Sequence, residues 1–218
     1  MKMFRKLYVL ISRKFRKQFN EHFRAKDIEI LKDKEFLIIS NNCWGGSVYQ
    51  WYKRPYNTPF VGLFIYSSCY LKMLRNFEYY MGQTLTFISE SKYPSTGKSY
   101  PIGLLKDIEI HFEHYKNEDE AREKWERRTK RMLEVNNIDN FFLKICDREL
   151  ISKSDLIEFH KLPFKNKISF SINDYDELKK CNHIKILECD KKRACVPNGK
   201  KLYELTYLYY DLNKWLVN

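Results

Sequence analysis

The sequence contains little glycine and little proline, 7 and 6 residues in a chain of 218. So few turn-forming residues exclude a linker-rich or disordered chain. It also lacks any apolar run near the roughly 20 residues of a membrane-spanning helix. The longest early apolar run, residues 7–11, is shorter than the core of a signal peptide. We therefore expect a folded, cytoplasmic protein.

The six cysteines include no Cys-x-x-Cys pair and show no spacing typical of a disulfide framework. A reducing compartment would leave them as free thiols. A zinc site built from Cys181, His183, Cys189 and Cys195 is not favoured, because the spacings between these cysteines are irregular. The sequence therefore predicts no metal site and no cofactor.

The residues that are abundant describe an ordinary folded domain with a basic N-terminus. Hydrophobic residues make up 44% of the chain and aromatic residues 16%, enough for one well-filled core. Of the formal net charge of +12, residues 1–26 carry +8, from nine Lys or Arg and one acid, Glu21. Residues 27–218 carry only +4, so we do not expect nucleic acid as a partner.

Residues 2–24 are predicted to form a basic amphipathic helix, which defines two parts: the helix in 1–26 and a single α/β domain in 27–218. Aromatic and aliphatic residues recur at helical spacing, and Lys or Arg fill the other faces. This pattern is typical of a helix on an anionic membrane surface. A helix docked on the domain has the same periodicity, and both interpretations stay open.

Beyond the helix, short apolar runs alternate with helical patterns, which favours a mostly parallel sheet with helices on both faces, a Rossmann-like three-layer fold. The predicted strands are residues 36–40, 60–66, 84–88, 107–112, 141–146, 167–171 and 184–188. The predicted helices are residues 47–52, 68–81, 117–135 and 153–161. A loop or hairpin turn is expected at 190–201, and residues 202–216 are ambiguous.

The first candidate site is the loop after the first predicted strand of the domain, Asn41-Asn42-Cys43-Trp44-Gly45-Gly46. In a parallel α/β sheet such a loop lies at the carboxyl ends of the strands, where ligands usually bind. The following helix N-terminus would lower the pKa of the Cys43 thiol, and its N–H groups would hold an oxyanion or phosphate. The alternative is a small buried cysteine in a tight turn.

The second candidate is the segment 107–115, in which period two places Asp107, Glu109, His111 and Glu113 on one strand face. His111, and His114 as the second choice, are the natural general bases for Cys43. The alternative is an edge strand with a hydrated acidic face.

The third candidate is the helix 118–131, where Trp125, Arg128 and Arg131 follow one another at intervals of three residues. An aromatic ring and two guanidinium groups suit an anionic ligand such as a diphosphate. The alternative is a solvated face with internal ion pairs.

Five segments occur in an order that resembles a bacterial family of unassigned function from capsule and exopolysaccharide gene clusters, domain of unknown function 1919. They are residues 36–46, 56–64, 100–103, 107–115 and 125–131, and the resemblance covers roughly residues 35–175. The first and fourth segments are the most specific. The resemblance implies a role in surface-polysaccharide biosynthesis.

Together these observations predict a transferase that acts on an activated sugar or a lipid-linked glycan precursor. Cys43 would be the nucleophile, with His111, His114 and Asp107 as its catalytic partners. Substrate would be bound by the remaining candidates, Asn41, Asn42, Trp44, Gly45, Gly46, Trp125, Arg128 and Arg131. Two alternatives stay open: a nucleotide-sugar-dependent glycosyltransferase, and a non-enzymatic scaffold. In each case we expect a location on the inner face of the cytoplasmic membrane, bound through residues 2–24.

Overall fold

The computed structural model describes residues 2–94, 97, 99–135 and 137–217. Its centre is a four-stranded sheet in the order β1-β5-β6-β7, in which every neighbouring pair is parallel. The strands are β1 (Leu37–Ser40), β5 (Phe141–Cys146), β6 (Asn166–Ser171) and β7 (His183–Lys185). The structure is therefore a mixed α/β fold with a parallel central sheet, as the alternation of strands and helices predicts.

The two faces of this sheet belong to two different hydrophobic clusters. Leu37, Ile39 and Leu143 lie in one cluster, and Ile38 and Phe142 in the other. This follows from the period of two along a strand, which sends neighbouring side chains to opposite faces. The first cluster includes residues of α4 (Ser67–Arg75), α5 (Phe77–Met81), α6 (Glu118–Leu133) and α7 (Lys153–Lys161), and the second includes residues of α3 (Trp44–Trp51), α8 (Gly199–Thr206) and α9 (Leu212–Val217).

A second, three-stranded sheet is antiparallel throughout, which the alternation of strands and helices does not predict. Its order is β2-β3-β4, from β2 (Thr86–Ile88), β3 (Ile102–Leu105) and β4 (Ile108–His111). The strand β3 was not predicted from the sequence, because it is short and contains a glycine. Gly103 is required there, since a Cβ would lie 2.6 Å from Phe112 and 2.7 Å from Leu85. The predicted strand at 60–66 is wrong: only a single bridge, Phe64 to His111, forms there.

Two predicted helices are each divided in two. The predicted helix 68–81 is interrupted at Asn76, whose φ of −127° and ψ of 50° are not helical. The N-terminal segment forms α1 (Lys2–Gln18) and α2 (Asn20–Ile30), separated at Phe19. The ambiguous C-terminal region forms α8 and α9.

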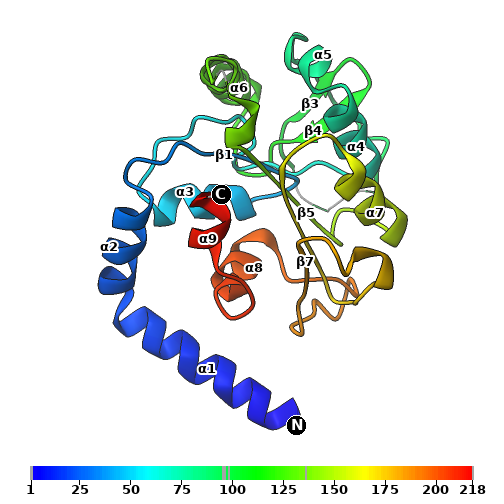
Figure 1. The fold of residues 1–218 in the computed structure, drawn as a ribbon. Helices are drawn as coiled ribbons and strands as arrows, with labels where there is room; N and C mark the ends of the chain where they lie inside the picture. The colour runs from blue at the N-terminus through cyan, green and yellow to red at the C-terminus, as the bar shows by residue number, and fades with distance from the viewer. Residues whose placement is uncertain (1, 95–96, 98, 136, 218) are drawn as a thin grey trace.

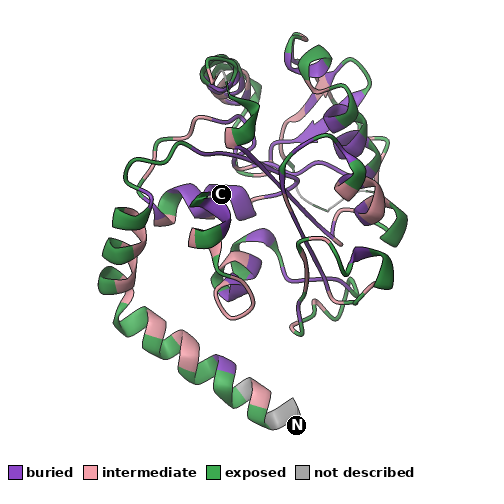
Figure 2. Cartoon of the chain, viewed as in Figure 1, coloured by how far each residue is buried: buried purple, intermediate pink, exposed green. Residues whose placement is uncertain are grey.

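Helix α1 contacts the domain through arginine side chains, and most of its apolar residues are exposed. Figures 1 and 2 show its place in the fold and its largely exposed surface. Arg13 pairs with Glu204 at 2.7 Å, and the guanidinium of Arg16 lies over the rings of Trp51 and Tyr207. The side chains of Phe4, Leu7, Tyr8, Leu10, Ile11, Phe15 and Phe19 are all exposed. Within the described residues, no helix has the length and apolar character needed to cross a membrane.

Candidate active site

The loop that carries Cys43 joins the carboxyl end of β1 to the amino end of α3. The hydroxyl of Ser40 donates to the carbonyl oxygen of Asn42 at 2.9 Å, and Asn42 Oδ1 accepts from the Trp44 amide at 3.3 Å. Short polar side chains make such local bonds readily, and so turn the chain directly after a buried strand. Cys43 is consequently held as the N-cap residue of α3, at the carboxyl edge of the parallel sheet.

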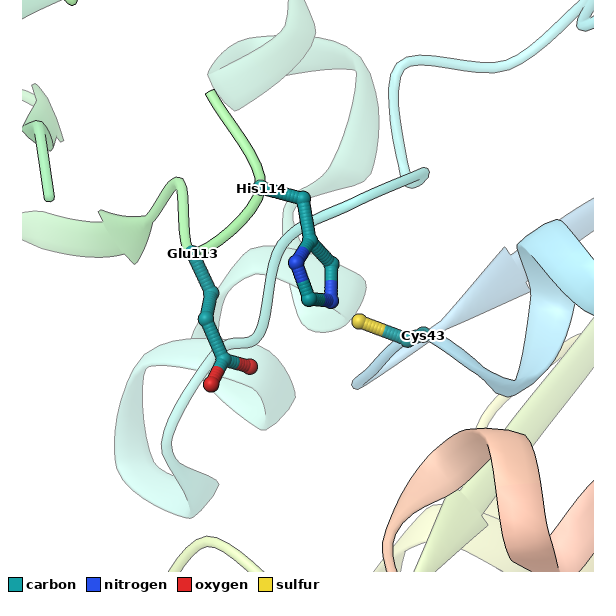
Figure 3. Close-up of side chains that lie close together, drawn as sticks. All are labelled: Cys43, Glu113 and His114. Atoms are coloured by element: carbon teal, nitrogen blue, oxygen red, sulfur yellow. The ribbon is translucent and has the colours of Figure 1, made fainter. Parts of the chain in front are cut away.

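Cys43, Glu113 and His114 meet at this edge (Figure 3). The sulfur, one carboxylate oxygen and one ring nitrogen all lie within 4.8 Å of one another. The imidazole of His114 is directed at the thiol, and Glu113 approaches from the neighbouring position of the same turn. Cys43 and Glu113 are partly buried and His114 is exposed, so the cluster is open to solvent on one side.

The turn after β4 holds Glu113 and His114 in place by backbone hydrogen bonds. The Glu113 amide donates to His111 O, and the His114 amide donates to Gly62 O, each at 3.0 Å. Gly62 has φ +74°, a left-handed conformation that favours glycine, and a Cβ there would lie 3.1 Å from Tyr115. The close approach of residues 61–63 to the turn therefore fixes where His114 stands relative to Cys43.

Arg128 helps to hold residues 61–63 in this position through Tyr115. It is buried in α6 and donates to the Tyr115 hydroxyl at 2.8 Å, which in turn donates to Val61 O at 2.6 Å. The diphosphate site that the sequence predicts from Trp125, Arg128 and Arg131 does not form on this helix. Trp125 is buried against Phe60 and Phe112, and Arg131 is exposed and donates to the carbonyl of Tyr56 at 3.4 Å.

The pKa of the Cys43 thiol is shifted in the direction opposite to the one that the sequence predicts. The pKa of Cys43 is raised to about 12, first by burial and then by the negative charges of Glu113 and Glu149. The charge of Lys144 acts in the opposite direction but is outweighed. The favourable field of the helix N-terminus does not overcome these effects. Near neutral pH the resting thiol is therefore protonated.

A buried polar network lies directly behind the Cys43 loop. Lys144, on β5, is fully buried and donates to Asn41 Oδ1 at 3.1 Å, Asn42 Oδ1 at 2.9 Å and the sulfur of Cys146 at 3.1 Å. Asn42 also donates to Glu149 at 3.3 Å. Asn42 thus joins a buried amine to a largely buried carboxylate and gives each of them a polar partner.

Glu149 is connected further to Arg148, whose Nε lies 3.6 Å from its carboxylate. Arg148 also bonds Asp190 at 3.1 Å and the carbonyl of Val196 at 2.7 Å. Burial raises the pKa of Glu149, while the charges of Arg148 and Lys144 oppose that shift. The carboxyl edge of the central sheet therefore carries several buried charges next to Cys43.

The other loop residues expected to contact substrate have roles inside the domain. Trp44 is fully buried and donates from Nε1 to Thr206 at 3.1 Å. A Cβ on Gly45 would lie 3.0 Å from the side chains of Ile38 and Ser40, and one on Gly46 would lie 3.2 Å from Val61. Asn41 and Asn42 are buried and bonded to Lys144. The amide of Trp44 is covered by the start of α8, where a Cβ on Gly199 would come within 2.6 Å.

His111 and Asp107, which the sequence predicts as catalytic partners of Cys43, are not part of the cluster at Cys43. His111 is buried, stacks on Phe64 with ring centroids 4.6 Å apart, and has Nε2 3.6 Å from Glu109. Burial lowers its pKa to about 4. Asp107 is exposed and bonds Lys72 and Tyr80. His114, rather than His111, is thus the histidine that the structure brings to Cys43, and the alternative of a hydrated acidic face on β4 fails because Glu109 is buried too.

Sequence reasoning missed Lys144 and Glu149 and did not select Glu113. A signal for Lys144 is present: it is the one charged residue in the otherwise apolar strand Phe141-Phe142-Leu143-Lys144-Ile145-Cys146. A charge inside a buried strand requires partners, and these lie in the neighbouring strand's loop. No comparable pattern distinguishes Glu149 from the other acidic residues.

Comparison with known proteins identifies a family and a relative. The family described as Domain of unknown function (DUF1919) matches residues 12–216. A Haemophilus influenzae protein, described as an uncharacterized protein, is 35% identical over 220 residues, covering 99% of this chain and 98% of that protein. The similarity to this relative therefore spans the N-terminal helix as well as the α/β domain.

Proposed function

We propose that this chain, which belongs to the DUF1919 family, is a transferase of surface-polysaccharide biosynthesis that uses Cys43 as its nucleophile. One observation carries the proposal: the thiol, the imidazole of His114 and the carboxylate of Glu113 gather within 4.8 Å at the carboxyl edge of a parallel sheet. A nucleophile beside a base is the arrangement that covalent group transfer requires. The resemblance of the sequence to capsule and exopolysaccharide proteins supplies the pathway.

The reaction begins from a protonated thiol, because the pKa of Cys43 is about 12. His114 accepts the thiol proton as sulfur attacks the activated carbon of a sugar or acyl donor. The sulfur–carbon bond forms, the bond to the leaving group breaks, and the leaving group takes the proton from the imidazolium. A hydroxyl of the acceptor glycan then attacks the thioester or thioglycoside. It gives its proton to His114, and Cys43 leaves and is reprotonated.

The alternative of a nucleotide-sugar glycosyltransferase has less support. Arg128 is committed to Tyr115, and Trp125 is in the core, so neither is available to a diphosphate. An Asp-x-Asp sequence, residues 174–176, follows β6, but Asp176 pairs with Lys179 at 2.7 Å on the surface. Within the described residues, the cluster at Cys43 does not include either of these aspartates.

The exposed apolar face of α1 favours a membrane-associated substrate. Its aromatic and aliphatic side chains are accompanied by exposed Lys14 and Lys17, which suits an anionic lipid surface. We infer that α1 holds the protein at the inner face of the cytoplasmic membrane, next to a lipid-linked precursor. The same face would also serve a non-enzymatic scaffold.

A complementation experiment separates the enzyme from the scaffold. A strain that lacks the gene is complemented with the wild-type chain, Cys43→Ala, or the matched control Cys189→Ala, which alters an exposed cysteine outside the cluster. We expect Cys43→Ala to abolish the change in surface polysaccharide and Cys189→Ala to restore it. Equal polysaccharide composition with both variants, at equal protein level, would contradict the nucleophile and favour the scaffold.

A further inference from the structure

The cluster at Cys43 contains one sulfur, one imidazole nitrogen and one carboxylate oxygen, the three ligand types that zinc takes in proteins. We propose that Cys43, Glu113 and His114 together bind one Zn²⁺ ion reversibly, and that the bound ion switches off the thiol. The binding is independent of the proposed function. Only its inhibitory consequence rests on that function.

The geometry suits a tetrahedral ion with three protein ligands. Around zinc, sulfur lies at about 2.3 Å and nitrogen or oxygen at about 2.0–2.2 Å, so tetrahedral donors stand roughly 3.5 Å apart. The three donor atoms already lie within 4.8 Å of one another, and small side-chain rotations would bring them to that spacing. The exposed side of the cluster leaves the fourth position to water, as in zinc sites with an open coordination position.

The backbone at the site is fixed before any ion binds. Cys43 is held by the turn that Ser40 and Asn42 form between β1 and α3. Glu113 and His114 are held by amide bonds to His111 O and Gly62 O, each at 3.0 Å. Ligands that are already positioned lose little conformational entropy on binding, which favours affinity.

The charges around the thiol also suit a cation better than a free thiolate. Glu113 lies in the cluster itself, and the carboxylate of Glu149 accepts from Asn42, the residue next to Cys43. A divalent ion is attracted by both carboxylates and stabilises the thiolate that it binds. On binding, the S–H bond of Cys43 breaks, the proton leaves to solvent and a sulfur–zinc bond forms. No electron is transferred.

A bound ion would occupy the sulfur lone pair with which Cys43 attacks and the ring nitrogen with which His114 accepts a proton. Transfer would therefore stop while zinc is present and resume when it is removed. This makes the free zinc concentration a reversible control on the proposed reaction.

Cobalt is the direct probe of the site, because a thiolate–Co²⁺ bond gives a charge-transfer band and tetrahedral Co²⁺ gives intense visible bands. The purified full chain is titrated with Co²⁺, and the bound Co²⁺ is then displaced with Zn²⁺. We expect one ion per chain, with the charge-transfer band absent in Cys43→Ser. Glu113→Gln and His114→Gln should weaken binding at least about 100-fold, since even residues behind the ligands cost up to that factor.

The matched control is Glu149→Gln, which removes the other carboxylate that acts on Cys43 without removing a donor. Its affinity should fall far less than that of Glu113→Gln. Equal affinities in these two variants, or no saturable band in the wild type, would overturn the proposal. Circular dichroism of every variant shows whether a loss of binding comes from unfolding.

Alkylation gives a second readout that needs no substrate. Equimolar Zn²⁺ should slow the reaction of Cys43 with iodoacetamide, a chelator should restore it, and the exposed Cys189 should be unaffected. Zinc protection with normal polysaccharide from Cys43→Ala would leave the metal site standing while the proposed function fails. The absence of protection, together with loss of polysaccharide in Cys43→Ala, would overturn the metal site while the proposed function stands.

Discussion

Lys144 donates a hydrogen bond to Asn42 Oδ1 at 2.9 Å, so a fully buried amine on the second strand of the sheet holds the loop that presents Cys43. The loop follows β1, and Lys144 lies on β5, its parallel neighbour. The position of the thiol therefore depends on a residue about one hundred positions away in the sequence.

Replacement of Lys144 by methionine tests this dependence. The change keeps most of the side-chain length but removes the lysine donor from the amide oxygens of Asn41 and Asn42 and one of the positive charges that act on Glu149. We expect the free energy of unfolding in urea to fall by about 2–4 kcal/mol, the usual cost of removing one partner of a buried polar group. An unchanged urea midpoint would show that the network does not anchor the loop.

Alkylation of Cys43 should be slow in the wild type and faster once a neighbouring carboxylate is removed. Because the thiol pKa is about 12, iodoacetamide should modify Cys43 at pH 8 at least about tenfold more slowly than the exposed Cys189. Glu113→Gln removes a charge that raises this pKa, so the Cys43 rate should rise while the Cys189 rate stays constant. Mass spectrometry of both peptides over time, in metal-free buffer, gives the two rates. A rate for Cys43 that matches Cys189 in the wild type would disprove the raised pKa.

The two histidines after residue 110 should differ in their effect on polysaccharide. His114→Gln removes the base beside the thiol and should reduce the product to the level of Cys43→Ala. His111→Phe should leave product unchanged, because a phenyl ring preserves the stack on Phe64 and the replaced imidazole is buried and neutral. Complementation with each variant, with protein levels measured by immunoblot, makes the comparison. Loss of product in His111→Phe alone would restore His111 as the base.

Local sequence patterns are sufficient to predict some strands and helices but not which histidine faces Cys43. The strand β5 is predicted at 141–146 because it is a short apolar run, and α7 is predicted at 153–161 because its apolar residues have helical spacing. The choice between His111 and His114 is not a matter of period. It depends on the turn after β4, which is set by bonds to Gly62 and by the packing of Tyr115, both non-local contacts.

The polar network behind Cys43 could not be predicted either, because it too depends on non-local contacts. Lys144 stands out in an apolar strand, but Asn42, which it bonds, and Glu149, which Asn42 bonds, come from two different loops. Only the order β1-β5 of the sheet brings those loops together. Likewise, charge spacing on α6 predicts a ligand site, whereas the packing of Trp125 and the bond from Arg128 to Tyr115 use those side chains within the domain.

Stability should fall as the pH is lowered from about 7 to 4, with His160 as one contributor. His160 accepts or donates a bond to Ser169 at 2.8 Å, and burial, then the charge of Lys167, lowers its pKa from 6.5 to about 4. Since the folded pKa lies below the unfolded value, the unfolded chain binds more protons in this window, and the free energy of unfolding decreases as the pH falls. The loss at pH 4 should be up to about 3 kcal/mol. Urea unfolding of His160→Gln across this range should show a shallower decline, and an identical decline would exclude His160.

Membrane binding by α1 should require both its exposed apolar face and anionic lipid. Ile11 and Phe15 project from the helix with exposed fractions of 58% and 54%, and burial of such side chains in the lipid interface is favourable. Each Lys or Arg close to an anionic surface adds about 1 kcal/mol, an attraction that salt screens beyond about 10 Å at 0.1 M. Arg13 and Arg16 already contact the domain, so Lys14 and Lys17 should contribute most of it.

Liposome co-sedimentation measures this binding. The wild-type chain should sediment with vesicles that contain phosphatidylglycerol, much less with phosphatidylcholine alone, and less again as salt is raised. Ile11→Gln with Phe15→Gln should release it, whereas Ile138→Gln, at an isoleucine with an exposed fraction of 54% outside α1, should not. If neutral and anionic vesicles bind equally, or if the α1 variant sediments like the control, α1 is a helix docked on the domain and not a membrane anchor. The lipid-linked substrate would then need another route to Cys43.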